Sequence, residues 1–353
     1  LKTRQGSSPR ALAAMWAAAL PALALLPICW ARRGSCPCLG AAEERYFHRE
    51  GMLLLKGVFA GGRRRMLWAA RRLLDRLWST PPRHAVQVEA TPQGDYDYSP
   101  IVDLAAVPPM KRRRLRRKNY RLYLNLSSPS VQAWTALMLE PRVRCHVEAL
   151  IGGRAMKATG LFFEWGTQQG LHADTWYGLG GSRPGSMIGA WYALDDSAPS
   201  IGNGPLMYLP GSHRLGPSCP ESCRGACRPT CMPGLLLNTI AQRLASRDMY
   251  EDAMWRANHN NLSVHALCAK AGDVVLWHES LMHGGWDIKS WNRTRRSLVF
   301  HFNAAPNGRG DAASPGRSLL RQPPRARCGP RGRRWTPAHT SCWNLAQFEN
   351  IVN

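Results

Sequence analysis

Acidic residues are scarce in this chain, whose 353 residues include 23 Asp and Glu against 47 Lys and Arg. The net charge of +24 would suit a nucleic-acid partner, but the excess cations are unevenly spread. Residues 120–302 hold 17 Lys and Arg and 13 Asp and Glu, so most of the charge lies in the two flanks. This distribution argues against nucleic-acid binding as the main role of the middle of the chain.

The sequence also has no internal repeat and, among its 11 cysteines, no Cys-x2-Cys pair. The first absence argues against a repeat architecture, and the second against a zinc site. Four cysteines recur at intervals of four residues: Cys219, Cys223, Cys227 and Cys231. Pro220 and Pro229 argue against a helix there. Disulfides are expected if this segment enters an oxidising compartment.

One long apolar run is present, at residues 11–30 (ALAAMWAAALPALALLPICW). It is long enough to span a bilayer and follows basic residues, an order typical of a signal peptide or signal anchor. Pro21 and Pro27 weaken it as a helix, so an Ala-rich leader without structural meaning is the alternative. We therefore expect the secretory pathway or a membrane anchor, or otherwise the cytoplasm. In the secretory case three sequons become relevant: Asn125, Asn261 and Asn292.

Composition divides the chain into four parts. Residues 1–50 are expected to be leader and linker, and residues 51–119 a basic linker that is partly helical or disordered. Within the linker, residues 51–84 have the pattern of a basic amphipathic helix. Residues 120–305 are expected to form the main domain. Residues 306–353 are rich in Pro, Arg and Gly without periodicity, which is typical of disorder.

The main domain is expected to open with helices and to continue with short strands. Apolar periodicity predicts helices over residues 131–139 and 141–151, the second ended by Gly152. Aromatic and aliphatic runs between turn clusters predict five strands: residues 158–165, 187–194, 206–209, 272–278 and 297–302. Such short strands with Gly and Pro turns indicate a mainly β fold, a sandwich or barrel, with flanking helices.

His172 and Asp174 form a His-x-Asp pair. On a strand, residues i and i+2 point to the same side, so the imidazole and the carboxylate would face one point. With one more histidine this is the 2-His-1-carboxylate triad, which leaves positions on Fe(II) open for a co-substrate and O2. A His-x-Asp pair alone is common, and a polar strand end would explain it equally well.

A second segment, residues 272–285 (GDVVLWHESLMHGG), supplies a strand followed by a turn that carries His283. Arg295 follows about a dozen residues later, and its guanidinium can offer a bidentate fork to the far carboxylate of a bound dicarboxylate. Ser297 lies two residues further along the strand, faces the same way and can donate another hydrogen bond. Metal ligands and an anion anchor thus occur in a working order.

Five segments, in the correct order, resemble the phytanoyl-CoA dioxygenase family: GTQQGLHADTWY (166–177), MIGAWYALDD (187–196), GPLMYLPGSHR (204–214), GDVVLWHESLMHGG (272–285) and RTRRSLVFHF (293–302). The resemblance covers residues 120–302, about half of the chain. It implies a double-stranded β-helix (a jelly roll, cupin-like) that binds Fe(II) and uses 2-oxoglutarate and O2. The activity implied is hydroxylation of a C–H bond, with release of succinate and CO2.

The resemblance also assigns roles to residues. It gives three iron ligands: His172, Asp174 and His283. Arg295 corresponds to the anchor of the 2-oxoglutarate carboxylate, and Trp191 to a tryptophan that lines the co-substrate pocket. Gln169 lies where the family places polar residues near the site. His278 is the rival for the third ligand, but the glycines after His283 favour His283 because glycine allows a close approach of the backbone. The carboxylate of Asp174 favours hydroxylation, because related halogenases replace it.

Several parts of the chain have no counterpart in the resemblance. Residues 216–234, which hold the four regularly spaced cysteines, are expected to be a surface insertion. The substrate is expected to be a small or lipid-like molecule that the sequence does not identify, since a fold and a cofactor do not fix the acceptor. No specific nucleic-acid partner is expected, and membrane association only through residues 11–30. The alternatives are a catalytically silent jelly roll and a basic binder of nucleic acid or membrane surfaces that acts through its flanks.

Overall fold

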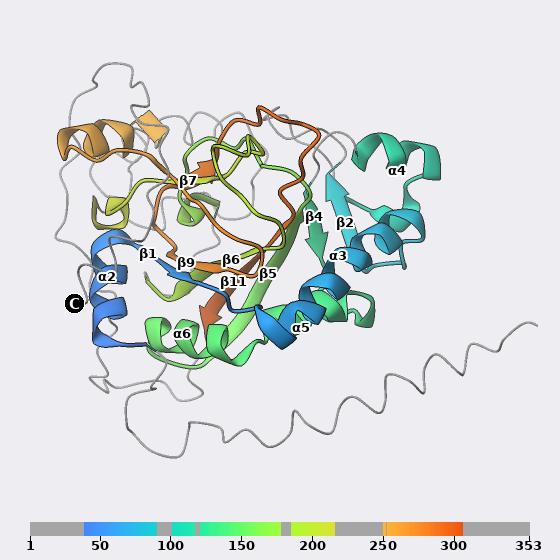
Figure 1. Cartoon of the computed structure of the whole chain (residues 1–353), viewed down its shortest axis with the longest axis horizontal. Coiled ribbons are helices and arrows are strands. Elements are labelled where there is room, and N and C mark those ends of the chain that lie inside the picture. The colour runs from blue at the N-terminus through green and yellow to red at the C-terminus, as the bar shows by residue number, and fades with distance from the viewer. Residues whose placement is uncertain are drawn as a thin grey trace, which may run out of the picture. The chain divides into compact units, whose positions relative to one another are not determined.

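The computed structural model describes the chain in six segments: residues 39–89, 101–116, 121–177, 185–215, 250–251 and 253–305 (Figure 1). The predictions for the apolar run at 11–30, the insertion at 216–234 and the tail at 306–353 concern residues outside these segments. Within the six segments, every helix is too short or too polar to cross a bilayer.

A large antiparallel sheet forms the centre of the molecule. In the described residues it has eight strands, in the order β1-β9-β6-β11-β5-β4-β2-β3. Their bounds, in that order, are Met52–Leu55, Val274–His278, Met187–Ala193, Ser297–Ala304, Ala155–Phe163, Leu122–Leu124, Val86–Glu89 and Ile101–Asp103. A second, three-stranded sheet has the order β10 (His283–Gly285), β7 (Leu206–Tyr208) and β8 (His265–Ala266).

Helices cover one face of the large sheet (Figure 1). They include α3 (Arg64–Ser79), α5 (Gln132–Met138) and α6 (Pro141–Ile151), whose apolar side chains share one core with outward-facing residues of the strands. The indole of Trp134 on α5 stacks on Phe162 of β5 at 4.9 Å and donates a hydrogen bond to the carbonyl of Ala70 on α3. The outer face of the sheet is therefore sealed by an apolar layer, and the inner face is the one that meets the second sheet.

The inner face carries the alternate residues of the same strands. A second apolar cluster contains Trp191 of β6, Val299 of β11 and Trp277 of β9 together with Leu206 and Tyr208 of the small sheet. Two antiparallel sheets that enclose an apolar interior are the jelly-roll arrangement. The predicted fold class, mainly β with flanking helices, is confirmed.

The two predicted helices of the main domain are confirmed as α5 and α6, and Gly152 ends α6 in the left-handed conformation with φ 73°. The five predicted strands correspond to β5, β6, β7, β9 and β11. The described segments also contain α2 (Ala41–Glu50), α4 (Pro109–Arg116), helical residues at 250–251 and 253–259, and five 3-10 helices: Gly61–Arg63, Leu104–Ala106, Pro129–Val131, Asp174–Tyr177 and Ser212–Leu215.

The start of the domain differs from the prediction. Residues 51–119 were expected to be a linker, but β1 pairs with β9 at the edge of the large sheet, with Met52 opposite Trp277. The helical pattern expected over residues 51–84 is realised only in α3, whose Leu74 and Leu77 are fully buried. The predicted boundary at residue 120 falls inside the sheet. The sequence did not show this, because short strands are stabilised by partners distant in sequence.

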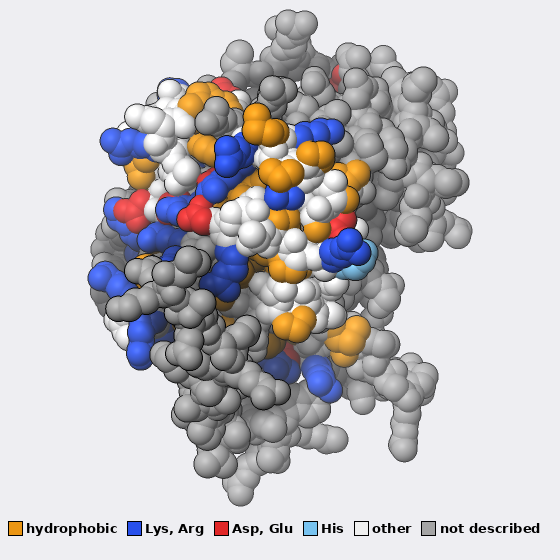
Figure 2. Space-filling view, turned by 90° about the vertical axis from the view of Figure 1, so that its right-hand side faces the viewer, with side chains coloured by type: hydrophobic (Ala, Val, Ile, Leu, Met, Phe, Trp, Pro, Cys, Tyr) orange, Lys and Arg blue, Asp and Glu red, His pale blue; other side chains and the backbone are white. Residues whose placement is uncertain are grey.

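The cations of α3 and α4 lie largely on the surface. Figure 2 shows a face on which Lys and Arg side chains lie among hydrophobic ones. Trp68 of α3 is 59% exposed, and the guanidinium of Arg72 lies 4.4 Å from the centre of its ring. Arg71, in contrast, turns inward, where its guanidinium donates to the carbonyl of Leu194. The charge of this segment is thus carried mostly by a solvated face of a packed helix.

Candidate active site

His172 and His283 are brought side by side by a pair of backbone hydrogen bonds. The amide of each donates to the carbonyl of the other, at 2.9 Å in both directions, and the two rings lie 4.6 Å apart. His283 begins β10 of the small sheet. Leu171 and Ala173, which flank His172, are buried in an apolar cluster that fixes this segment. Both imidazoles are themselves buried.

Backbone carbonyls set the tautomer of both histidines. Nδ1 of His172 lies 2.8 Å from the carbonyl of Gly170, and Nδ1 of His283 lies 3.0 Å from that of Leu281. A carbonyl oxygen only accepts, so in the neutral form of each ring Nδ1 carries the proton and Nε2 carries the lone pair. Neutral imidazoles with the lone pair on Nε2 are the form in which histidine binds a metal.

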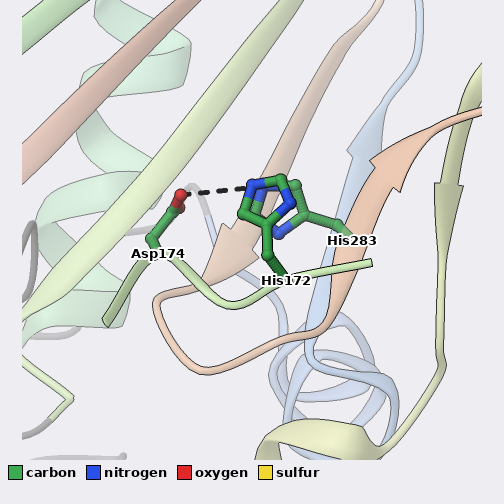
Figure 3. Close-up of side chains that lie close together, drawn as sticks. All are labelled: His172, Asp174 and His283. Atoms are coloured by element: carbon green, nitrogen blue, oxygen red, sulfur yellow. Dashed lines mark ion pairs between the residues drawn. The ribbon is translucent and has the colours of Figure 1, made fainter. Parts of the chain in front are cut away.

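Asp174 completes a cluster of three possible metal ligands (Figure 3). Its Oδ1 lies 3.7 Å from Nε2 of His283, and the ligand atoms of His172, Asp174 and His283 all lie within 4.8 Å of one another. The prediction that His172 and Asp174 face one point is confirmed. The strand geometry behind it holds only in part, because Asp174 begins a 3-10 helix (Asp174–Tyr177) while His172 lies in an isolated bridge.

Burial and neighbouring groups keep these ligands in their metal-binding forms. Burial, together with the nearby His283, lowers the pKa of His172 to about 3. Burial alone would raise the pKa of Asp174, but His283 and His301 hold it below its usual range. One carboxylate and two imidazoles are a donor set that suits Fe(II) and similar divalent ions.

Arg295 precedes β11 and is 1% exposed. Its Nη2 lies 3.5 Å from the carbonyl of Trp165, and its guanidinium carbon lies 5.5 Å from the ring centre of Trp191. Burial lowers its pKa to about 10, so the group is still charged at neutral pH. Its Nε and Nη1 have no hydrogen-bond partner, and in the described part of the chain no carboxylate pairs with it.

Two further buried donors near this arginine are also unsatisfied. Within the described segments, neither Oγ of Ser297 nor Nε1 of Trp191 has a hydrogen-bond partner. Ser297 and Val299 face the same side of β11, and Val299 lies opposite Trp191 in the sheet. The adjacent Arg296, by comparison, is fully engaged by a bidentate ion pair with Asp195. Unsatisfied donors around a buried cation are what an anchor for a carboxylate requires.

The other predicted residues have different surroundings. Gln169 is linked to the site through its backbone, because its carbonyl accepts from the amide of Gly285 at 2.9 Å. A side-chain role for Gln169 stays a prediction. A Cβ on Gly284 would lie 2.5 Å from that same carbonyl oxygen. Gly284 and Gly285 therefore leave room for residues 167–170 beside them.

The rival histidine lies outside the cluster. His278 accepts a hydrogen bond from the amide of Ser280, and its ring lies 5.2 Å from that of His213. Nε2 of His213 donates to the carbonyl of His48, as suits a structural residue. Two contacts to Asp174 escaped the sequence analysis, one from Trp277 and one from His301. For His301 a signal was available, since it lies four residues after Ser297 on a strand and so shares its face.

A model of the phytanoyl-CoA dioxygenase family matches residues 47–297, which is more than half of the chain. The match begins before β1 and therefore includes this strand, which pairs with β9 in the large sheet. No curated protein matches the chain significantly.

Solved structures resemble the chain at low identity. EctD from S. alaskensis, with bound Fe, is 16% identical with a TM-score of 0.51, over 79% of this chain and 82% of that one. HygX from Streptomyces hygroscopicus, with nickel and 2-oxoglutarate bound, is 18% identical with a TM-score of 0.45, over 75% of this chain and 87% of that one. The family match and the His-Asp-His cluster lead to the same conclusion. The chain belongs to the phytanoyl-CoA dioxygenase family of Fe(II)- and 2-oxoglutarate-dependent oxygenases.

Proposed function

We propose that this chain hydroxylates a C–H bond of a small or lipid-like molecule, with iron held by His172, Asp174 and His283. The observation that carries the proposal is the presence of two buried features in one domain. One is a buried cluster of three metal ligands, and the other is a buried arginine without a carboxylate partner among the described residues. Either feature alone has simpler explanations, but together they match a metal and a dicarboxylate bound side by side.

His172, Asp174 and His283 would hold the metal through two imidazoles and one carboxylate, a set that would leave positions open for a co-substrate and O2. The iron, when bound, activates O2 by coupling its reduction to the oxidative decarboxylation of 2-oxoglutarate to succinate and CO2. The carboxylate of Asp174 supports hydroxylation as the outcome. The surrounding apolar cluster, which includes Trp277 and Leu281, excludes water from this space.

The co-substrate is held at its far end, in this proposal, by Arg295. Its Nε and Nη1, which have no hydrogen-bond partner among the described residues, offer N–H donors on different edges of the guanidinium, and Ser297 offers another donor through its hydroxyl. Trp191 lies beneath the guanidinium and contributes an indole N–H. A dianionic ligand would therefore replace an unfavourable buried charge by a buried ion pair.

The test is turnover of 2-oxoglutarate by the full chain without added substrate. Many oxygenases of this kind are expected to form succinate slowly even when uncoupled, so Fe(II)- and O2-dependent succinate can be measured directly. We expect succinate from the wild type, and a loss of at least roughly 100-fold for Arg295→Met when 2-oxoglutarate is limiting. The matched control is Arg296→Met, whose ion pair with Asp195 lies outside the site, and it should retain turnover.

The alternative of a catalytically silent jelly roll predicts a different result. Such a protein would bind metal and 2-oxoglutarate and yet form no succinate above the metal-free background. The alternative of a basic binder that acts through its flanks would show neither property. Membrane association through residues 11–30 stays a prediction that this assay does not address.

A further inference from the structure

The two carboxylate oxygens of Asp174 have different neighbours. Oδ1 lies 3.7 Å from Nε2 of His283. Oδ2 accepts a hydrogen bond from Nε1 of Trp277 at 2.7 Å and lies 3.4 Å from Nε2 of His301. We infer that a row of four residues across the large sheet holds Oδ2 and so directs Oδ1 alone to the metal: Trp277, Gly189, His301 and Thr159. The inference rests on the proposed function, because it concerns a ligand of the proposed iron site.

The row is defined by the register of four adjacent strands, β9, β6, β11 and β5. Gly189 of β6 lies opposite Trp277 on one side and opposite His301 on the other. His301 in turn lies opposite Thr159 of β5. Residues opposite one another in adjacent strands share a face, so these four lie at one level of the inner face.

Gly189 allows the indole of Trp277 to reach Asp174. A Cβ at this position would lie 2.3 Å from Cε2 and 2.4 Å from Nε1 of Trp277, so the indole lies directly on the backbone of β6. Every residue of β6 is buried, and glycine inside a strand weakens it. The close approach of the indole accounts for the glycine, since any larger residue would displace the nitrogen that donates to Asp174.

Thr159 completes the row from the other side. Its hydroxyl lies 2.5 Å from Nδ1 of His301. When the hydroxyl donates to Nδ1, the proton of a neutral imidazole lies on Nε2, which is the atom that faces Oδ2 of Asp174. In that tautomer the N–H of His301 lies 3.4 Å from the oxygen that accepts from the indole, although within the described residues Nε2 makes no hydrogen bond.

The indole hydrogen bond to Oδ2, with the imidazole of His301 at 3.4 Å beside it, leaves Oδ1 as the better metal ligand. An aspartate whose oxygens are both unoccupied can bind a metal through the two together, which uses an additional coordination position. A carboxylate held at one oxygen binds through the other, and this keeps positions open for a co-substrate and O2. Trp277, His301 and Thr159 are therefore positioning residues, and they act on the metal only through Asp174.

The experiment uses the full chain loaded with Co(II) in place of iron, because the visible spectrum of Co(II) reports coordination number and geometry. The test variant is Trp277→Phe, which removes the indole donor and keeps an aromatic ring beside His283, now 4.6 Å from the indole. The matched control is Trp134→Phe, which also loses a buried indole hydrogen bond, but on the outer face of the sheet. Gly189→Ala is a second test variant that displaces the indole without removing it.

We expect Trp277→Phe and Gly189→Ala to raise the dissociation constant for Co(II) by about 10- to 100-fold and to change the Co(II) spectrum. Trp134→Phe should leave the affinity and the spectrum as in the wild type. The inference is overturned if Trp277→Phe, folded as judged by circular dichroism, binds Co(II) with the affinity and spectrum of the wild type. If the wild type itself binds no Co(II), the proposed function fails. If the wild type and the variants bind Co(II) equally well, only the inference about Asp174 fails.

Discussion

The metal side and the anion side of this site differ in how far their polar atoms are satisfied. On the metal side, Nδ1 of His172, Nδ1 of His283 and Oδ2 of Asp174 each have a partner within the protein. On the anion side, the described residues offer no partner to Nε and Nη1 of Arg295 or to Oγ of Ser297. The residues of both sides are buried, so burial alone does not explain the difference.

The difference indicates what each side does when a ligand binds. A buried donor without a partner costs about 1–3 kcal/mol, and more for a charged group. The metal side has avoided that cost by fixing its ligands in advance, so the metal meets a preformed site. The anion side carries the cost in the folded protein and recovers it when a carboxylate binds. Mutations on the two sides should therefore have opposite effects on the stability of the ligand-free protein.

The largest expected effect is the loss of metal binding in His172→Ala. Loss of a hydrogen-bond partner of a ligand costs about 10- to 100-fold in metal affinity, so loss of the ligand itself should exceed roughly 100-fold. Titration with Fe(II) under anaerobic conditions measures it. The matched control is His146→Ala, because His146 is equally buried but lies on α6, where its ring nitrogen bonds the carbonyl of Arg142. Equal losses in both variants would contradict the assignment.

Arg295→Met should affect the anion side alone, by lowering the affinity for 2-oxoglutarate and not the affinity for iron. Two lost charge-assisted hydrogen bonds, at about 1.5–3 kcal/mol each, should weaken 2-oxoglutarate binding by roughly 100-fold or more. Iron affinity should be unchanged. Removal of a buried charge without a carboxylate partner should also stabilise the ligand-free protein by about 1–3 kcal/mol, which chemical denaturation measures. A ligand-free protein that is destabilised by this change would show that the arginine has a partner after all.

Acid should weaken the fold through the metal side. The folded pKa of His172 is about 3, below the ordinary value of 6.5, so between these values the unfolded chain binds a proton that the folded protein does not. The free energy of unfolding should therefore fall as the pH drops below 6.5, by up to about 1.4 kcal/mol per pH unit from this residue, with no contribution above 6.5.

The contrast between the two sides supplies the control for this pH dependence. His172→Gln carries no titrating group, so its unfolding free energy should depend less steeply on pH between 5 and 6.5. Arg295→Met should keep the slope of the wild type, because the pKa of Arg295 is about 10 and the group stays charged in this range. Parallel slopes for the wild type and His172→Gln would show that His172 does not stay neutral in the folded protein.

The smallest effect is expected for Ser297→Ala. A single neutral hydrogen bond contributes about 1 kcal/mol, so 2-oxoglutarate affinity should fall by about 5-fold. Metal affinity should not change, which calorimetric titration of each ligand can verify. A loss as large as that of Arg295→Met would mean that the hydroxyl, and not the guanidinium, is the main anchor.

Local pattern was sufficient to predict the middle of the domain. The strands that become β6, β9 and β11 are apolar runs bounded by turns, and the ligands lie beside them in short motifs. The edge of the domain was not predictable in this way. Met52–Leu55 is a four-residue apolar run before a basic helix, and it becomes a strand only because β9 offers it a partner from the far end of the chain.

The same limit applies within the site. His172, Asp174, His283 and Arg295 could be named because short segments carry them. The contacts of Trp277 and His301 with Asp174 depend on strand register. Gly189 lies between these two residues because β9, β6 and β11 are adjacent in the sheet. The sequence named Arg295 as the anchor by resemblance, and the ion pair of Arg296 with Asp195 gives a structural reason why the adjacent arginine is engaged elsewhere.

The central claim, that one site holds a metal and a dicarboxylate together, is tested most directly by the weak visible charge-transfer band of 2-oxoglutarate chelated to Fe(II). We would record it anaerobically with the full chain, beside His172→Ala and Arg295→Met. The account predicts a band in the wild type, no band in His172→Ala, and a band in Arg295→Met that needs roughly 100-fold more 2-oxoglutarate. A folded, iron-loaded wild type that shows no band at saturating 2-oxoglutarate would contradict it.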